Sequence, residues 1–105
     1  MHGPFEYSAI LRRQNWARHE SKRPELTGQS DHIAACIRDP EIVIDTGDGC
    51  DHFYKMGFGT GKLANCYLHV LVRAFAIDDP GQRTVVSAWF TQVLEEGEMK
   101  WPRVT

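Results

Sequence analysis

The segment ANCYLHVLVRAFA, residues 64–76, is the longest apolar run of the chain, and it constrains the fold most strongly. An apolar run of this kind, bounded by turn-forming residues, is typical of a strand in the middle of a sheet. Side chains alternate between the two faces of a strand. The even-numbered residues from Cys66 to Ala74 are therefore expected to form an apolar face that packs against helices. The odd-numbered residues from Tyr67 to Phe75 include a tyrosine, a histidine and an arginine, and they predict a polar and aromatic face opposite.

The segment RTVVSAWFTQV, residues 83–93, is predicted to be the next strand, with a similar two-faced pattern. One face is expected to be apolar, and the other mixes apolar, hydroxyl and aromatic side chains. The first face has Val86, Ala88 and Phe90, and the second has Val85, Ser87, Trp89 and Thr91.

Two helices and several short strands are expected in the rest of the chain. Pro24 should end the first helix, because a proline disfavours helical geometry at the residue before it. The second helix has Ser30 or Thr27 as its candidate N-cap, and its apolar stripe is Ile33, Cys36 and Ile37. The helices are predicted at residues 15–22 and 26–39, and the strands at residues 5–13, 41–45 and 52–56.

Short turns rich in glycine and aspartate connect these strands at residues 46–51 and 57–62, and a longer loop is expected at residues 77–82. Such turns favour antiparallel pairing. Residues 94–105 are expected to be a polar tail with a candidate hairpin. The sequence therefore predicts an α+β fold in which two N-terminal helices pack on one face of an antiparallel sheet of about four strands.

The composition predicts one soluble domain spanning residues 1–105, with 42% hydrophobic and 25% charged residues. No apolar run approaches the roughly 20 residues that a membrane-spanning helix needs. The first residues also lack the pattern of a secretory signal, so we expect a cytoplasmic protein without a membrane partner. The formal net charge is −2, but residues 1–23 hold five basic and two acidic side chains. Such a local basic edge can still attract phosphate groups.

Common motifs for metal, nucleotide and nucleophile chemistry are absent from the sequence. The three cysteines, Cys36, Cys50 and Cys66, form no CxxC pair, and Cys36 and Cys66 have the surroundings of core thiols. The five histidines form no HxH or HxxxH pair. The segment GFGTGK lacks the spacing of a Walker A motif, and there is no GxSxG nucleophile motif. We therefore expect no metal and no cofactor.

Histidine, lysine and arginine supply the parts for metal-free acid–base chemistry. A histidine can accept or donate a proton near neutral pH while a cationic side chain holds an anion. RNA cleavage needs a base for the 2′-OH, an acid for the leaving oxygen and cations for the charged intermediate. The candidate cations and imidazoles are His19, Lys22, Arg23, Lys55, His69 and Arg73, and the candidate base-stacking residues are Tyr54, Tyr67 and Trp89.

Five short motifs occur in order over roughly residues 14–92. They are Trp16-Ala17-Arg18-His19, Arg23-Pro24-Glu25-Leu26, Asp39-Pro40-Glu41-Ile42-Val43, Phe53-Tyr54-Lys55 and Val86-Ser87-Ala88-Trp89-Phe90-Thr91. In this order and spacing they resemble a bacterial and phage group of nuclease-like domains, the PBECR type, named for barnase, EndoU, colicin and RelE folds.

The resemblance implies a RelE/barnase-like fold and a metal-independent RNA endonuclease, either a toxin or a phage-encoded effector. In that reading His19 is the acid or base, Arg23 and Lys55 bind phosphate, and Thr91 or Ser87 supplies a hydroxyl. Cleavage by attack of the 2′-OH would leave a 2′,3′-cyclic phosphate. A histidine often stands where this chain has Arg23, which is either an exchange of one cation for another or the loss of a catalytic imidazole.

Three functions are therefore carried forward. In the ribonuclease, His19, Thr91 and His69 are the catalytic candidates, and Arg23, Lys55, Tyr54, Lys22 and Trp89 are the candidate substrate-binding residues. In the second, the same fold is a non-catalytic module that binds RNA, a nucleotide or a protein. In the third, it pairs with an antitoxin-like or immunity-like protein, or with itself as a homodimer, through exposed Trp89 and Phe75.

Overall fold

Six strands and one α-helix have defined bounds in the computed structural model, which describes residues 4–5, 8–10, 17–18, 21–22, 28–73 and 82–102. The strands form one sheet in the order β1-β5-β4-β3-β2-β6. The elements are β1 (Ser8–Ile10), α2 (Ser30–Arg38), β2 (Ile42–Asp45), β3 (Cys50–Lys55), the short 3-10 helix η2 (Gly61–Leu63), β4 (Tyr67–Arg73), β5 (Gln82–Thr91) and β6 (Glu98–Trp101).

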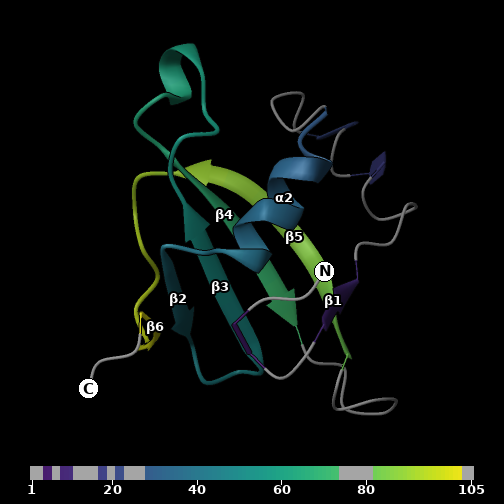
Figure 1. Cartoon of the computed structure of the whole chain (residues 1–105), viewed down its shortest axis with the longest axis vertical. Helices are drawn as coiled ribbons and strands as arrows, with labels where there is room; N and C mark the ends of the chain where they lie inside the picture. The colour runs from purple at the N-terminus through teal and green to yellow at the C-terminus, as the bar shows by residue number, and fades with distance from the viewer. Residues whose placement is uncertain are drawn as a thin grey trace.

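The α+β class predicted from the sequence is confirmed, and most of the sheet is antiparallel. The expected number of about four strands is too low. The C-terminal tail adds β6 at one edge by pairing with β2. The strand predicted at residues 5–13 is present as β1, which pairs in parallel with β5 at the other edge. Figure 1 shows these two strands on opposite sides of the sheet.

The expected pair of N-terminal helices is not confirmed. Residues 17–18 and 21–22 are helical and exposed, but the rest of the expected helix at 15–22 lies outside the described residues. The second expected helix is present as α2, which is shorter than predicted. Gln29 occupies its N-cap position without a side-chain cap, in place of Ser30 or Thr27, and Asp31 lies in the first turn as expected.

Helix α2 covers one face of the sheet, which we call the inner face (Figure 1). Its predicted apolar stripe is confirmed, because Ile33, Cys36 and Ile37 are all buried. Removing an aliphatic side chain of this size from water stabilises a fold by about 1.5–3 kcal/mol. The stripe belongs to a core that also contains Ala9, Val43, Phe53, Leu68, Val70, Val72, Val85 and Ala88.

The alternation predicted for β4 is confirmed, since Leu68, Val70 and Val72 all lie in this core. The prediction for Val85 is wrong. The register shifts between Leu71 and Val72, which pair with Ser87 and Val85 and leave Val86 without a direct partner. One extra residue of this kind reverses the alternation beyond it, so Val85 is buried on the inner face.

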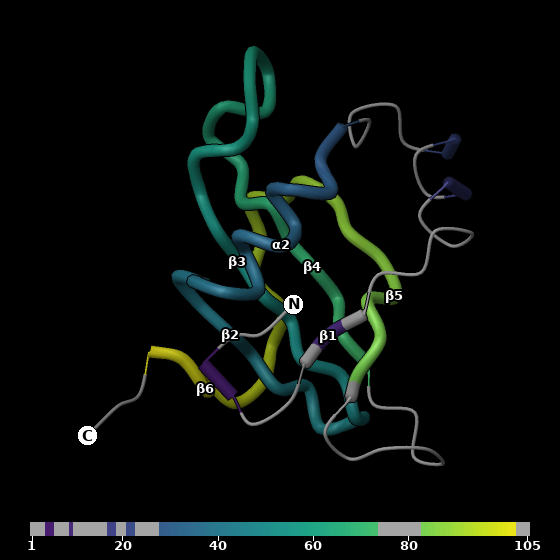
Figure 2. Tube along the Cα trace, turned by 45° about the vertical axis from the view of Figure 1, so that its right-hand side comes forward, coloured from purple at the N-terminus to yellow at the C-terminus, as the bar shows by residue number. Residues whose placement is uncertain are grey.

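The opposite face, here the outer face, is crossed by the connection between β5 and β6. Figures 1 and 2 together place this yellow connection on the side of the sheet away from α2. The backbone N–H of Glu95 donates a hydrogen bond to the Tyr54 hydroxyl, 2.9 Å away. The connection therefore covers the β3 side of the outer face. No helix within the described residues is long and apolar enough to cross a membrane.

Candidate functional site

The outer face collects polar and aromatic side chains from four strands. Ile42, Tyr54, His69 and Trp89 are successive cross-strand partners on β2, β3, β4 and β5. A second row lies beside them. Because directly paired residues share a face, the register brings together side chains that are far apart in the sequence. The second row is Ile44, His52, Leu71 and Ser87.

Two buried imidazoles form a hydrogen-bonded pair on this face. His52 Nδ1 lies 2.7 Å from His69 Nε2. The other nitrogen of His52, Nε2, lies 3.2 Å from the Thr46 hydroxyl. That hydroxyl donates to the carboxylate of Asp48 at 2.6 Å. A continuous chain of hydrogen bonds therefore connects the exposed Asp48 with the buried His69.

His69 lies between two aromatic rings and is only 1% exposed. Ring centroids are 4.3 Å apart for His69 and Tyr54, and 3.9 Å apart for His69 and Trp89. Burial, and to a smaller extent the neighbouring His52, lowers the pKa of His69 to about 3. A neutral, enclosed imidazole is a poor proton donor to an external substrate. The geometry thus gives His69 a packing position rather than an accessible catalytic one.

Tyr54 is also enclosed, with an exposed fraction of 0%. Burial, together with the nearby Glu95 carboxylate, raises the pKa of its hydroxyl, and the hydrogen bond from the Glu95 N–H opposes that shift. The edge of Tyr67 packs against it with ring centroids 6.0 Å apart. No face of the Tyr54 ring is open for a base to stack on.

The open part of the outer face is a strip along β4 and β5, which we call the β4–β5 strip. Its side chains are half-buried, except for the exposed Arg73 at one end. Thr91 closes a turn at the other end, where its hydroxyl accepts from the Val93 N–H at 3.1 Å and donates to the Val93 carbonyl at 3.3 Å. The strip comprises Tyr67, Leu71, Arg73, Ser87, Trp89 and Thr91.

Lys55 lies away from this strip. It pairs with Leu68, an inner-face core residue, whereas Thr91 pairs with Tyr67 on the outer face. The Lys55 ammonium donates to the Asp39 carbonyl at 2.6 Å and to the Asp39 carboxylate at 3.3 Å, just beyond the C-terminus of α2. Lys55 and Thr91 therefore lie on opposite faces of the sheet. The ribonuclease hypothesis needs only one of them beside His19 and Arg23.

The remaining predicted site residues come from the N-terminal part of the chain. Lys22 is exposed and helical. His19 and Arg23 lie outside the described residues, so their predicted roles stay predictions.

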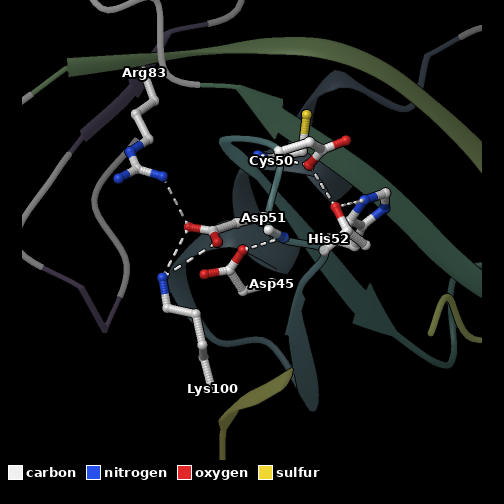
Figure 3. Close-up of polar contacts among 9 residues, drawn as sticks. Asp45, Cys50, Asp51, His52, Arg83 and Lys100 are labelled. Atoms are coloured by element: carbon white, nitrogen blue, oxygen red, sulfur yellow. Dashed lines mark hydrogen bonds and ion pairs between the residues drawn. The ribbon is translucent and has the colours of Figure 1, made fainter. Parts of the chain in front are cut away.

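A buried charge cluster on the inner face was not anticipated from the sequence. Asp51 is 1% exposed and accepts hydrogen bonds from Arg83 at 3.1 Å and from Lys100 at 3.2 Å (Figure 3). The sequence places Asp51 in an expected turn, but β3 begins one residue earlier, at Cys50. Residues two apart on a strand share a face, so Asp51 is buried on the same face as Phe53. A strand predicted to begin at Cys50 would have placed Asp51 there.

The described residues contain no group of three or more histidine, cysteine or acidic side chains arranged to hold a metal ion. All three cysteines are free and buried. Burial raises the pKa of the Cys36 thiol to about 12, which leaves it unreactive at neutral pH. Burial also raises the pKa of the Cys50 thiol, with the neighbouring Asp48 carboxylate acting in the same direction.

No protein-family model, curated protein or solved structure matches the chain.

Proposed function

We propose that this chain is an RNA-directed domain of nuclease type, and that its β4–β5 strip binds single-stranded RNA. One observation carries the proposal: the half-buried rings of Tyr67 and Trp89 lie on one open sheet face with the hydroxyls of Ser87 and Thr91 and the cation of Arg73. Aromatic rings on an exposed sheet surface stack with unpaired bases, and an arginine at the edge of the strip can contact a phosphate.

The charges around the strip favour stacking over phosphate contacts. Glu95, Glu96 and Glu98 are exposed on and beside the connection that crosses the outer face. Lys55 and Lys100 are paired with carboxylates on the inner face. Because few phosphates are neutralised, the affinity should depend only slightly on salt. For a single strand, the logarithm of the binding constant falls by about 0.7 per phosphate contact for each tenfold rise in salt concentration.

Cleavage is the second part of the proposal, and it depends on His19. The enclosed, neutral His69 is poorly suited to proton transfer, which leaves His19 as the predicted acid or base and Arg23 as the predicted phosphate ligand. Attack of the 2′-OH on its own phosphate would break the bond to the 5′ oxygen, and the products would be a 2′,3′-cyclic phosphate and a 5′-hydroxyl.

Binding is tested by fluorescence anisotropy with a labelled single-stranded RNA in EDTA. Truncation of a base-stacking side chain removes about 1–3 kcal/mol per base, so Trp89→Ala and Tyr67→Ala should each weaken binding about 5- to 150-fold. Trp89→Phe keeps an aromatic ring and should retain most of the affinity. Val93→Ala, which alters a side chain that is 73% exposed outside the strip, is the matched control.

Equal affinity of Trp89→Ala and the wild type would contradict the proposed strip. If no RNA binds at all, the proposal fails in favour of a protein partner or a homodimer, and light scattering would detect the latter. Cleavage is tested separately on the same RNA in EDTA. Loss of cyclic-phosphate products in His19→Ala would support catalysis, whereas binding without cleavage by the wild type would indicate a non-catalytic RNA-binding module.

A further inference from the structure

The hydrogen-bond chain from Asp48 to His69 has a direction, which follows from counting its hydrogens. A neutral histidine has one N–H and one bare nitrogen, and the partners of each nitrogen decide which is which. The Thr46 hydroxyl donates its single hydrogen to the Asp48 carboxylate. It must therefore accept a hydrogen from Nε2 of His52, which lies 3.2 Å away.

The same count fixes the tautomer of His69. With its hydrogen on Nε2, His52 offers a bare Nδ1, so His69 must donate from Nε2 across the 2.7 Å contact. Nδ1 of His69 is then bare, and within the described part of the chain it is a buried side-chain nitrogen for which no hydrogen-bond partner is present. The reversed chain would leave an N–H at that position and would remove the hydrogen bond to the Asp48 carboxylate. The first direction is favoured for two reasons. It leaves a bare nitrogen, instead of an N–H, without a partner at Nδ1 of His69, and it keeps the charge-assisted hydrogen bond to the Asp48 carboxylate.

A proton added to the intact pair has no suitable place. Each nitrogen of His52 and Nε2 of His69 already takes part in a hydrogen bond. A third hydrogen on the two rings must therefore reside on Nδ1 of His69, where no acceptor is present. A positive charge there would also be buried between Tyr54 and Trp89. The pair can accept protons only if it separates.

The surroundings of the pair give little compensation for such a charge. Asp48 is the anionic end of the chain, but its carboxylate already accepts from Thr46 and from the Cys50 N–H. The neighbouring groups on β3 and β4 are the Cys50 thiol, the Tyr54 and Tyr67 hydroxyls and the Arg73 cation. Those on β5 are Ser87 and Trp89, and the β5–β6 connection contributes Glu95.

We propose that the His52–His69 pair is a pH-sensitive latch, which holds the turn at Thr46–Asp48 and the ring of Trp89 in place while it is neutral and releases both when it is protonated. Separation exposes two imidazoles, so opening takes up close to two protons. The latch joins the turn after β2 to the β4–β5 strip, although the two are far apart in the sequence. This inference does not depend on RNA binding, because its readouts are measured on the free protein.

The test begins with the tautomers, measured by long-range proton–nitrogen NMR on the wild-type protein near pH 7.5. We expect the hydrogen of each ring to be on Nε2, with Nδ1 bare in both. A hydrogen on Nδ1 of His69 would overturn the direction of the chain and with it the latch.

An acid titration then follows the amide signals of Thr46 and Asp48 and the indole N–H of Trp89. We expect all three to change at one midpoint below about pH 6.5 with a slope near two protons. His69→Gln, which cannot be protonated, should abolish the two-proton slope, and His32→Gln, at a half-buried histidine on α2, should leave it unchanged. Titration of His69 alone with the other signals fixed, or no change down to pH 3.5, would overturn the proposal.

Discussion

Asp51 is a carboxylate enclosed in the interior of the fold and compensated by two cations, Arg83 and Lys100. Its side chain is only 2% exposed, whereas those of Arg83 and Lys100 are 25% and 28% exposed. Removing one partner from a buried ion pair leaves the rest uncompensated and destabilises strongly. The partial exposure of both cations softens this effect, because they can turn toward water.

Asp51→Asn should therefore lower the free energy of unfolding by about 2–4 kcal/mol, as measured by urea denaturation. The matched control is Asp39→Asn, because Asp39 pairs with Lys55 but its side chain is 89% exposed. An exposed pair of this kind contributes less than about 1 kcal/mol. Equal effects of the two substitutions would show that the burial of Asp51 does not increase the loss of unfolding free energy.

The lowered pKa of His69 makes the stability of the fold depend on pH. While the His52–His69 pair is closed, the folded-state pKa of His69 is about 3 and the ordinary value is 6.5, so below pH 6.5 and until the pair opens, the unfolded chain binds more protons than the folded one. Stability is therefore complete above about pH 6.5 and falls as the pH decreases below it. The expected slope approaches 1.4 kcal/mol per pH unit for this single group.

Urea denaturation at pH 7.5, 6, 5 and 4.5 measures that slope. His69→Gln should flatten it, whereas His32→Gln on α2 should leave it close to the wild-type slope. If stability is constant from pH 7.5 to 4.5 in the wild type, the folded state must protonate His69 as readily as the unfolded chain does.

At the scale of the elements, Lys55 stabilises the end of α2. Its ammonium contacts the Asp39 carbonyl at the helix C-terminus, where a positive charge interacts favourably with the helix dipole. Lys55→Met should cost about 0.5–1 kcal/mol and should increase amide hydrogen exchange in the last turn of α2. It should leave RNA affinity unchanged, because Lys55 does not belong to the β4–β5 strip. A strong loss of RNA affinity without a change in exchange would restore the phosphate-binding role predicted from the sequence.

Strands β4 and β5 show which features of an element a sequence pattern can predict and which it cannot. The alternation in β4 was predicted correctly because a strand that is regular from end to end keeps its period of two. In β5 the same reasoning failed at Val85, since a bulge depends on the partner strand and has no local signal in RTVVSAWF. The C-terminal tail was predicted only to hold a candidate hairpin, and the pairing of β6 with β2 was missed because it joins segments that are more than 50 residues apart.

At the scale of the whole molecule, the α+β class and the two-faced sheet follow from the sequence, but the polar clusters do not. His52 and His69 are 17 residues apart, and Asp51 and Lys100 are 49 residues apart. Their contacts depend on strand order and register, which composition and periodicity do not specify. The same limit explains why Lys55 and Thr91 were assigned to one site although the sheet separates them.

The pairing of β6 with β2 at the edge of the sheet makes the C-terminal segment part of the folded core instead of a polar tail. Trp101 on β6 pairs with Val43, packs against the core and makes an edge-on contact with Phe5. Met99 on the same strand pairs with Ile44 and is 46% exposed.

Trp101→Ala should therefore lower the free energy of unfolding by about 2–4 kcal/mol, because it removes a large ring from the core and leaves a cavity. Met99→Ala should cost less than about 1 kcal/mol, since most of its surface stays in contact with water. Both are measured by urea denaturation under the same conditions. A tail that does not belong to the core would give two small and equal effects, and the sheet would then end at β2.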